Sequence, residues 1–233
     1  METVVIVSCR FEWQAVTELF SGVGRERTPF GEAFELPDHE PPVVFIEGGW
    51  GKVSAAASAQ YAIARWRPRL VLNLGTCGGF AGEIAPGEVI LAERTVIYDI
   101  IEQMTDPAAA IEHYSTSLDL SWAPAATPQP VRRAVLVSAD RDLVCPEIAS
   151  LKARFGAVAG DWESGAIAWV AARNGVRAVI LRGVSDLVDS EGGEAYGAVG
   201  VYAEGAKRVM RDLVANLPAW IELAMPRGTG ASA

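Results

Sequence analysis

The chain has few histidines and cysteines, two and three respectively. Its two histidines, His39 and His113, have no further metal-ligand residue at a useful spacing, so the sequence predicts no structural zinc site. The three cysteines, Cys9, Cys77 and Cys145, lie far apart without a CxxC motif. An odd, scattered set is typical of reduced thiols and favours a cytoplasmic location.

Long apolar runs and basic clusters are also absent. No stretch of about 18 uncharged apolar residues is present, so no segment is expected to span a membrane. The first residues carry no basic region ahead of their apolar run, unlike a signal peptide. With a net charge of −9 and no run of lysine or arginine, the chain lacks the basic surface that nucleic acid or an anionic membrane would require.

What the chain does contain is typical of a compact enzyme-like protein. Half of its 233 residues are apolar, and it has 23 glycines, so one large core is expected rather than a disordered chain. We predict a single catalytic domain over 1–224. The last residues, 225–233, are rich in small and polar types and are expected to form a disordered tail.

Short β-branched runs alternate with alanine-rich stretches of helical periodicity. Several runs are apolar throughout, which is typical of strands covered on both faces. This alternation predicts an α/β fold, a three-layer αβα sandwich around a mixed, mainly parallel central sheet. The predicted strands are 3–9, 43–49, 69–76, 88–99, 133–140 and 177–186, and the predicted helices are 12–22, 52–66, 146–155, 163–174 and 197–215.

Residues 100–130 interrupt this alternation. Proline, serine and alanine are frequent there, with Tyr114 and Trp122 between them. A long irregular segment inside a compact domain is more often a functional loop or lid than a passive connection.

Unusual polar residues follow the predicted strands. Ligands of open α/β sheets bind at the carboxyl ends of the strands, so these residues are expected to share one edge. They are Glu12 after the first strand, the "GGWG" turn after the second, Thr76 and Gly78 in "GTCGG" after the third, and Ser185 and Asp186 at the end of the last.

Each of these residues also has a structural explanation. Glu12 could interact with a helix macrodipole, Asp186 could cap a turn, and Glu163 could pair with Arg182. The "GGWG" turn matches neither a Walker loop nor a GxGxxG fingerprint. The convergence of several such residues on one edge favours a single site over independent explanations.

The chemistry available to such an edge is narrow, because no Ser/His pair and no metal cluster is predicted. Carboxylates alone can cleave glycosidic bonds: one protonates the leaving group, another activates water, and the transition state is an oxocarbenium ion. A further carboxylate, Glu163, could accept two hydrogen bonds from a cis-diol.

Three stretches resemble one known family. "GDWESGAIAWVAARNGVRAVILRGVSD" is similar to the ribose-binding helix and following strand of the purine nucleoside phosphorylase and nucleosidase superfamily. "EGGWGKVSAAASAQYAI" and "VLNLGTCGGFAGEIAPGEVILAERTVIYD" resemble its glycine turn, helix and central strand. The first strand and Glu12 resemble the hydrolytic branch, the 5′-methylthioadenosine/S-adenosylhomocysteine nucleosidases. The similarity runs in order over residues 3–215.

This resemblance implies a role for each matching residue. Glu12 would orient the attacking water with Thr76 nearby, and Asp186 would be the general acid toward N7 of a purine. Glu163 would accept the ribose 2′- and 3′-hydroxyls. The implied substrate-binding residues are Thr76, Gly78, Leu143, Trp162, Glu163, Arg182 and Ser185, of which Arg182 and Ser185 would orient Asp186. We expect Asp186 to carry the raised pKa when substrate is bound.

The chain departs from the family pattern at two substrate contacts. Where the nucleosidases have an aromatic residue that stacks on the purine and then an aliphatic one, "ADRDLV" has Asp142 and Leu143 after Arg141. Trp162 replaces a residue that is usually methionine. The same reaction on a different nucleoside, such as a futalosine-type nucleoside, is therefore an open alternative.

Two other functions remain as alternatives. A phosphorylase would need cations for phosphate, which Arg10 and Arg94 could supply, although Glu12 would repel the anion. A non-catalytic nucleoside-binding protein would share the fold. The favoured hypothesis is hydrolysis of a small-molecule purine nucleoside without a cofactor or metal. By resemblance we expect a homodimer in which 100–130 closes the neighbour's site.

Overall fold

The computed structural model describes residues 2–36 and 39–225. Its strands form one mixed sheet, in the order β10-β6-β8-β9-β5-β1-β4-β3-β2, with β7 beside β6. The predicted tail at 226–233 lies outside the described residues. Among the described residues, no helix is both long and apolar enough to cross a bilayer.

The centre of the sheet is parallel. β1 (Thr3–Val7) lies between β4 (Val43–Glu47) and β5 (Leu70–Phe80), and β5 also pairs in parallel with β10 (Arg177–Val188). The apolar residues of β1, from Val4 to Val7, are fully buried, as expected for strands covered on both faces.

Part of the sheet closes on itself. β10 pairs antiparallel with β6 (Val89–Ile97), which continues in parallel through β8 (Arg132–Ser138) to β9 (Ala157–Asp161). β9 then pairs antiparallel with β5. Because β5 also pairs with β10, these strands form a closed ring. The predicted mixed sheet with helices is confirmed, whereas the three-layer sandwich stays a prediction, because this part of the sheet is closed.

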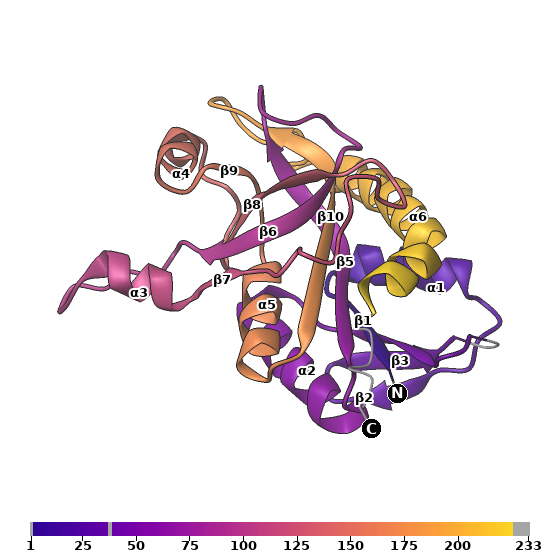
Figure 1. The fold of residues 1–233 in the computed structure, drawn as a ribbon. Coiled ribbons are helices and arrows are strands. Elements are labelled where there is room, and N and C mark those ends of the chain that lie inside the picture. Colours follow the sequence, from indigo (N-terminus) through magenta and orange to yellow (C-terminus); the bar gives the residue numbers. More distant parts are fainter. Residues whose placement is uncertain (1, 37–38, 226–233) are drawn as a thin grey trace.

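Helices lie on two sides of the sheet (Figure 1). α1 (Arg10–Leu19) lies beside α6 (Val199–Ala224) on one side, and α2 (Gly51–Trp66) beside α5 (Ser164–Arg173) on the other. Two buried apolar clusters follow the same division, one including Ala59 of α2 and Ile167 of α5 and the other Val16 of α1 and Leu213 of α6.

All the predicted strands and helices are present, with shifted ends. The helix predicted to end at 215 extends to Ala224, and α5 begins at Ser164, so Glu163 is its N-cap rather than its first residue. The remaining elements were not predicted: the short strands β2 (Glu26–Thr28), β3 (Gly31–Glu35) and β7 (Ser115–Ser117), the strand β9, and the helix α3 (Pro107–His113). The predicted helix 146–155 is a 3-10 turn (Cys145–Glu147) followed by α4 (Ile148–Phe155).

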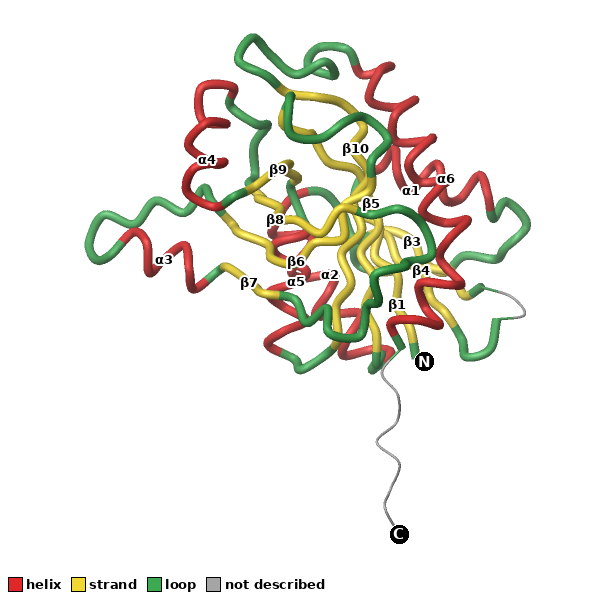
Figure 2. The backbone as a smooth tube through the Cα atoms, turned by 45° about the horizontal axis from the view of Figure 1, so that its top comes forward, coloured by secondary structure: helices red, strands yellow, loops and turns green. Residues whose placement is uncertain are grey.

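The segment 100–130 is less irregular than predicted. It contains α3, whose first turn is capped by the Asp106 side chain (2.9 Å to the Ala108 N–H), and β7, which pairs with β6. Figure 2 shows α3 projecting from the edge of the molecule, beside the sheet. No residue of this segment lines the pocket described below, so within its own chain it is not a lid.

Candidate active site

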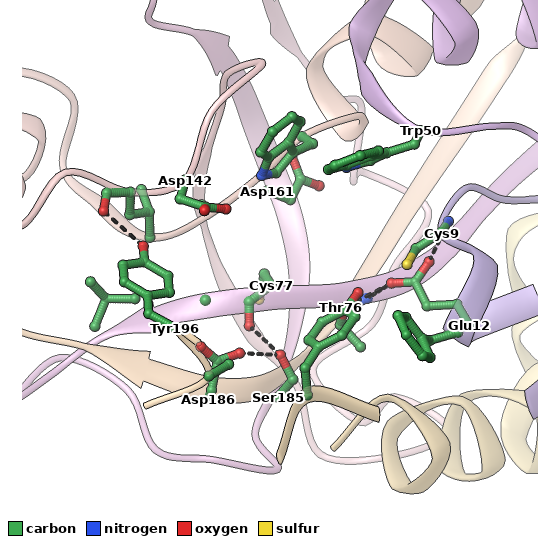
Figure 3. Close-up of a pocket in the computed structure, with 18 of the residues that line it drawn as sticks. Cys9, Glu12, Trp50, Thr76, Cys77, Asp142, Asp161, Ser185, Asp186 and Tyr196 are labelled. Atoms are coloured by element: carbon green, nitrogen blue, oxygen red, sulfur yellow. Dashed lines mark hydrogen bonds between the residues drawn. The ribbon is translucent and has the colours of Figure 1, made fainter. Parts of the chain in front are cut away.

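A pocket of about 570 Å³ opens where β1, β5, β9 and β10 end, as predicted for the carboxyl ends of parallel strands. Figure 3 shows Glu12, Cys9 and Trp50 at one end of it and Asp142, Tyr196 and Asp186 at the other. We call these the sugar end and the base end, after the roles that the resemblance implies.

Glu12 lies at the floor of the sugar end and is 1% exposed. Its Oε1 accepts hydrogen bonds from the Thr76 backbone N–H (2.6 Å) and the Thr76 hydroxyl (2.7 Å). Its Oε2 accepts the Cys9 N–H (3.2 Å), which satisfies an otherwise unpaired donor at the start of α1. Glu12 therefore bonds the start of α1 and lines the pocket at the same time.

Arg182 on β10 is the buried cation beneath this end, 1% exposed. Its Nε lies 2.9 Å from Asp161, and its two terminal nitrogens lie 3.8 Å from Glu12 and 3.8 Å from Glu163. Burial alone would lower the pKa of Arg182, but these carboxylates, led by Asp161, raise it, so the guanidinium stays charged.

Gly75 makes room for this arrangement. A Cβ at this position would lie 1.8 Å from the Arg182 Nη1 atom and 2.9 Å from the Glu12 Oε1 atom. Any side chain there would therefore displace the cation or the carboxylate.

Glu163 reaches the pocket from the N-cap of α5 and is 5% exposed. It accepts the Gly51 N–H at the start of α2 (3.1 Å). Burial raises the pKa of Glu163 to about 8, with further increases from Asp161 and Glu12 and opposing effects of Arg182 and the Gly51 N–H. Its pairing with Arg182 confirms the structural explanation, yet the same carboxyl group lines the pocket.

Asp186 lies at the base end, 6% exposed, and accepts a hydrogen bond from the Ser185 hydroxyl (2.5 Å). Burial raises the pKa of Asp186, as do the neighbouring carboxylates Glu194 and Asp142, while the Ser185 hydrogen bond lowers it. The pKa of Glu163 is raised as well, and the expectation that Asp186 carries the raised pKa with substrate bound stays a prediction.

Arg182 does not orient Asp186, contrary to the role that the resemblance implied. Besides its carboxylate partners it donates to Asn73 (2.8 Å) and to the Thr76 carbonyl (3.4 Å). Ser185 is the residue that contacts Asp186. Since Arg182 does not line the pocket itself, it can act on a ligand only through the lining residues that it contacts, such as Glu12, Asp161 and Glu163.

The other predicted residues line the pocket. Thr76 and Gly78 come from β5, Leu143 from the loop after β8, and Trp162 from the turn between β9 and α5. Trp162 contacts the exposed Trp50 of the "GGWG" turn, with ring centroids 4.8 Å apart. This turn contributes an aromatic wall as well as a tight bend.

Several lining residues escaped the sequence analysis. Tyr202 on α6 places its hydroxyl 3.1 Å from the Thr76 hydroxyl, and Tyr196 donates to the Leu143 carbonyl (2.7 Å). Cys9 lines the sugar end, and Asp161 accepts from the Ser138 hydroxyl (2.6 Å). Asp161 had a sequence signal, because it adjoins Trp162 and Glu163, whereas nothing local distinguishes Tyr202 within an amphipathic helix.

Of the two arginines that could bind phosphate, one lines the pocket and the other does not. Arg10 lines the pocket near Glu12, but Arg94 on β6 pairs with Glu112 (2.5 Å) and does not line it. Arg141 lines the base end and pairs with Glu147 (2.6 Å). In the part of the chain that the structure describes, no group of three or more His, Cys, Asp or Glu residues is placed to hold a metal ion.

The pocket at the strand ends has carboxyl groups at both of its ends. This arrangement is typical of α/β proteins that bind a small molecule and act on it with carboxylates. A family model described as "Phosphorylase superfamily" matches residues 3–216. The chain belongs to this superfamily, which confirms the resemblance seen in its sequence.

Two curated relatives that the chain resembles are nucleosidases. A 5′-methylthioadenosine/S-adenosylhomocysteine nucleosidase of Marinomonas sp. is 31% identical over 101 residues, which cover 43% of this chain and 44% of the relative. The nucleosidase of Actinobacillus succinogenes is 28% identical over 194 residues, 77% of this chain and 84% of the relative.

Solved structures show the same fold. The Helicobacter pylori 5′-methylthioadenosine/S-adenosylhomocysteine nucleosidase with butyl-thio-DADMe-Immucillin-A has a TM-score of 0.77 at 21% identity, covering 94% of this chain and 98% of that one. The futalosine hydrolase of the same organism has a TM-score of 0.77 at 21% identity, covering 93% and 97%.

Proposed function

We propose that the protein hydrolyses the N-glycosidic bond of a purine nucleoside in this pocket and releases the free base and a ribose derivative. The observation that carries the proposal is the pair of carboxyl groups at opposite ends of one pocket, Glu12 at the sugar end and Asp186 at the base end (Figure 3). The nucleosidase names of the curated relatives support it.

Glu12 is the general base. Its Oε1 accepts two hydrogen bonds from Thr76, while Oε2 accepts, among the described residues, one hydrogen bond from the Cys9 N–H. Because a carboxylate oxygen has two lone pairs, Oε2 can still accept a hydrogen bond from a water molecule. The Arg182 guanidinium lies 3.8 Å from Oε1 and compensates the charge of this carboxylate.

Asp186 is the general acid. A group of this kind must carry a proton at the working pH, and the raised pKa of Asp186, caused first by burial, favours that form. Ser185 fixes the orientation of the carboxyl group. Protonation of N7 makes the purine a neutral leaving group.

Glu163 and Trp162 bind the sugar. A carboxyl group can form hydrogen bonds with two hydroxyls of a cis-diol. Because the pKa of Glu163 is raised, its protonated form can donate one of these hydrogen bonds and accept the other. Trp162 lies beside it, while Gly78 and Leu143 face the base.

The reaction balances without a cofactor. The C1′–N9 bond breaks through an oxocarbenium-like transition state, and its electron pair leaves with the purine, which takes the proton of Asp186. A water oxygen bonds to C1′ and passes a proton to Glu12. Transfer of that proton back to Asp186 through solvent completes the cycle.

Phosphorolysis is the second candidate, because Arg10 lines the sugar end. Phosphate binding relies on cations and backbone N–H donors, and the Glu12 carboxylate, which lines the same end as Arg10, would repel the anion. A nucleoside-binding protein without activity is the third candidate. A futalosine-type nucleoside remains among the substrates of the proposed hydrolase.

The remaining expectations are part of this proposal. The protein is a cytoplasmic enzyme with one catalytic domain over 1–224, and it forms a homodimer in which 100–130 closes the neighbour's pocket. Neither nucleic acid nor a membrane is a partner.

Free base release tests the function. The protein is incubated with 5′-methylthioadenosine, S-adenosylhomocysteine, inosine and futalosine, each with and without phosphate. We expect base release that needs no phosphate. Release that requires phosphate would establish phosphorolysis, and tight nucleoside binding without any release would establish the binding protein.

Glu12→Gln tests whether Glu12 is the general base. We expect kcat to fall about 10²–10⁴-fold, because the amide cannot take the proton. Glu18→Gln is the matched control, since Glu18 lies on the same helix with its side chain 46% exposed and away from the pocket. It should leave kcat unchanged.

A further inference from the structure

Tyr202 lines the sugar end of the pocket, but the proposed reaction gives it no role. It lies near the start of α6, and its ring packs edge-to-face on Phe11 of α1, with centroids 5.7 Å apart. Three residues later, Gly205 lets α6 approach β10 closely, because a Cβ there would lie 3.0 Å from the Ser185 carbonyl oxygen. These contacts hold the helix where the Tyr202 hydroxyl reaches Thr76 on β5.

Tyr202, Thr76 and Glu12 form a row of hydrogen bonds. The Tyr202 hydroxyl lies 3.1 Å from the Thr76 hydroxyl, which lies 2.7 Å from Glu12 Oε1. The Thr76 hydroxyl has one proton to donate. The carboxylate form of Glu12, which a general base requires, has none, so the Thr76 proton is directed to Glu12. The Thr76 oxygen is then the acceptor of the other hydrogen bond, and Tyr202 is its donor.

Tyr202 has a proton available for this hydrogen bond. Burial raises the pKa of Tyr202, and the charge of Glu12 raises it further, so the hydroxyl keeps its proton at neutral pH. The Cys9 thiol is a second acceptor near this hydroxyl, and its pKa is also raised, first by burial, so it stays neutral. A thiol is a weaker acceptor than a hydroxyl oxygen. The Tyr202 proton is therefore directed to Thr76.

The direction of the row determines which oxygen of Glu12 is free. Hydrogen bonds in a row strengthen one another, so donation by Tyr202 strengthens the bond from the Thr76 hydroxyl to Oε1. This bond holds one oxygen of the carboxylate at the pocket floor (Figure 3). Oε2, on the other side, is left to accept from the attacking water.

We propose that Tyr202 is a positioning residue for the general base: its hydroxyl donates to Thr76 and thereby directs the Thr76 proton to Glu12. This inference rests on the proposed function, in which Glu12 is the base. It adds a residue of α6 to a pair that comes from α1 and β5. Because the hydroxyl acts through Thr76, its loss should lower kcat and leave KM nearly unchanged.

Tyr202→Phe removes the hydroxyl and keeps the aromatic ring. We expect kcat to fall about threefold to tenfold, which corresponds to one hydrogen bond, with KM within about twofold of the wild-type value. An unchanged or higher kcat would overturn the proposal. That result would mean that Thr76 donates to Tyr202, so that removing the tyrosine hydroxyl releases the Thr76 proton for Glu12.

Tyr61→Phe is the matched control. Tyr61 lies on α2, where its ring contacts Phe30 and Trp66, and it does not line the pocket. This variant loses the same hydroxyl group from the same type of side chain. It should keep the wild-type kcat and KM.

A double-mutant cycle separates this role from a general effect on packing. Thr76→Val removes the hydroxyl that joins Tyr202 to Glu12. In this background, Tyr202→Phe should lower kcat by less than about twofold, because the row is already broken. A loss as large as in the wild type would show that Tyr202 acts by another route and would overturn the proposal.

Urea unfolding tests the row without turnover. Tyr202→Phe should lower the urea midpoint less in Glu12→Gln than in the wild type, because the row then no longer ends on a charge. If no nucleoside is cleaved but this difference is found, the hydrolase function fails and the positioning of Glu12 by Tyr202 stands. If Tyr202→Phe lowers the midpoint equally in both backgrounds, the positioning fails whatever the activity.

Discussion

At the sugar end of the pocket, Glu12, Asp161 and Glu163 surround a guanidinium that is 1% exposed, whereas at the base end Asp142 faces solvent and Tyr196 is 41% exposed. Every buried charge at the sugar end has a partner, because an unpaired charge there would cost several kcal/mol. At the base end, a ligand can supply the missing partner. The sugar end is therefore compensated by charges of the protein itself, whereas the base end is more open to the solvent.

Removing the central cation should have the largest effect. Arg182→Met leaves the buried carboxyl groups around it, Asp161 first among them, without their counter-ion, so we expect the free energy of unfolding to fall by about 3–5 kcal/mol at pH 7. Urea unfolding followed by circular dichroism measures it. Arg25→Met, which breaks the exposed Arg25–Glu32 pair, is the control and should cost less than about 1 kcal/mol. Similar losses in the two variants would contradict the comparison.

Glu163→Gln should make stability less dependent on pH. With its pKa raised from 4.5 to about 8, Glu163 stays protonated in the folded state while the unfolded state releases the proton. Its contribution is therefore fully present below pH 4.5 and is lost as pH rises to about 8. The variant lacks this loss, so it should gain on the order of 2–4 kcal/mol relative to wild type between pH 4.5 and 8.

Unfolding free energies measured at several pH values provide the check. Parallel curves for wild type and Glu163→Gln would show that Glu163 titrates normally. In that case the charges at the sugar end would interact with Glu163 less strongly than the structure indicates.

Ser185→Ala should shift the pH profile at the base end. The variant removes the hydroxyl donor that lowers the Asp186 pKa, while the burial that raises it is unchanged. A general acid loses activity as pH rises through its pKa, so the alkaline limb of kcat/KM should move upward by about 0.5–1 pH unit. If the alkaline limb of kcat/KM does not move, a group other than Asp186 causes it.

Trp50→Ala should have the smallest effect. Trp50 is 67% exposed and contacts Trp162 at 4.8 Å, so its loss should change stability by less than about 1 kcal/mol. We expect KM to rise roughly twofold to fivefold with kcat unchanged, because the aromatic wall binds substrate without acting in the reaction. Trp50→Phe should restore the wild-type KM. An unchanged KM in Trp50→Ala would show that Trp50 does not contribute to substrate binding.

The sequence predicted the parts of the site that depend on strand ends. Glu12, Thr76, Ser185 and Asp186 each follow an apolar run, and parallel strands bring such ends to one edge. Short elements such as β2 and β9 were missed, because a run of three to five residues carries too little periodicity to be recognised.

Contacts between distant side chains were beyond sequence reasoning. Arg182 was expected beside Asp186, four residues later on the same strand, but it points to Asp161 and Glu12 instead. Successive side chains of a strand alternate between faces, but β10 has an irregularity between Val184 and Asp186, so spacing alone does not give the direction of either residue.

By itself, the sequence determined the alternation of apolar strands with helices and the acidic residues at the strand ends, because both follow from local periodicity and chain order. Only the tertiary structure decided which charges are compensated. Arg182 on β10 meets Glu12 of α1 and Asp161 of β9, while Asp142 has no hydrogen-bond or ion-pair partner among residues 2–36 and 39–225. Charge compensation depends on distances through space between residues far apart in the chain, and those distances exist only once the sheet has closed.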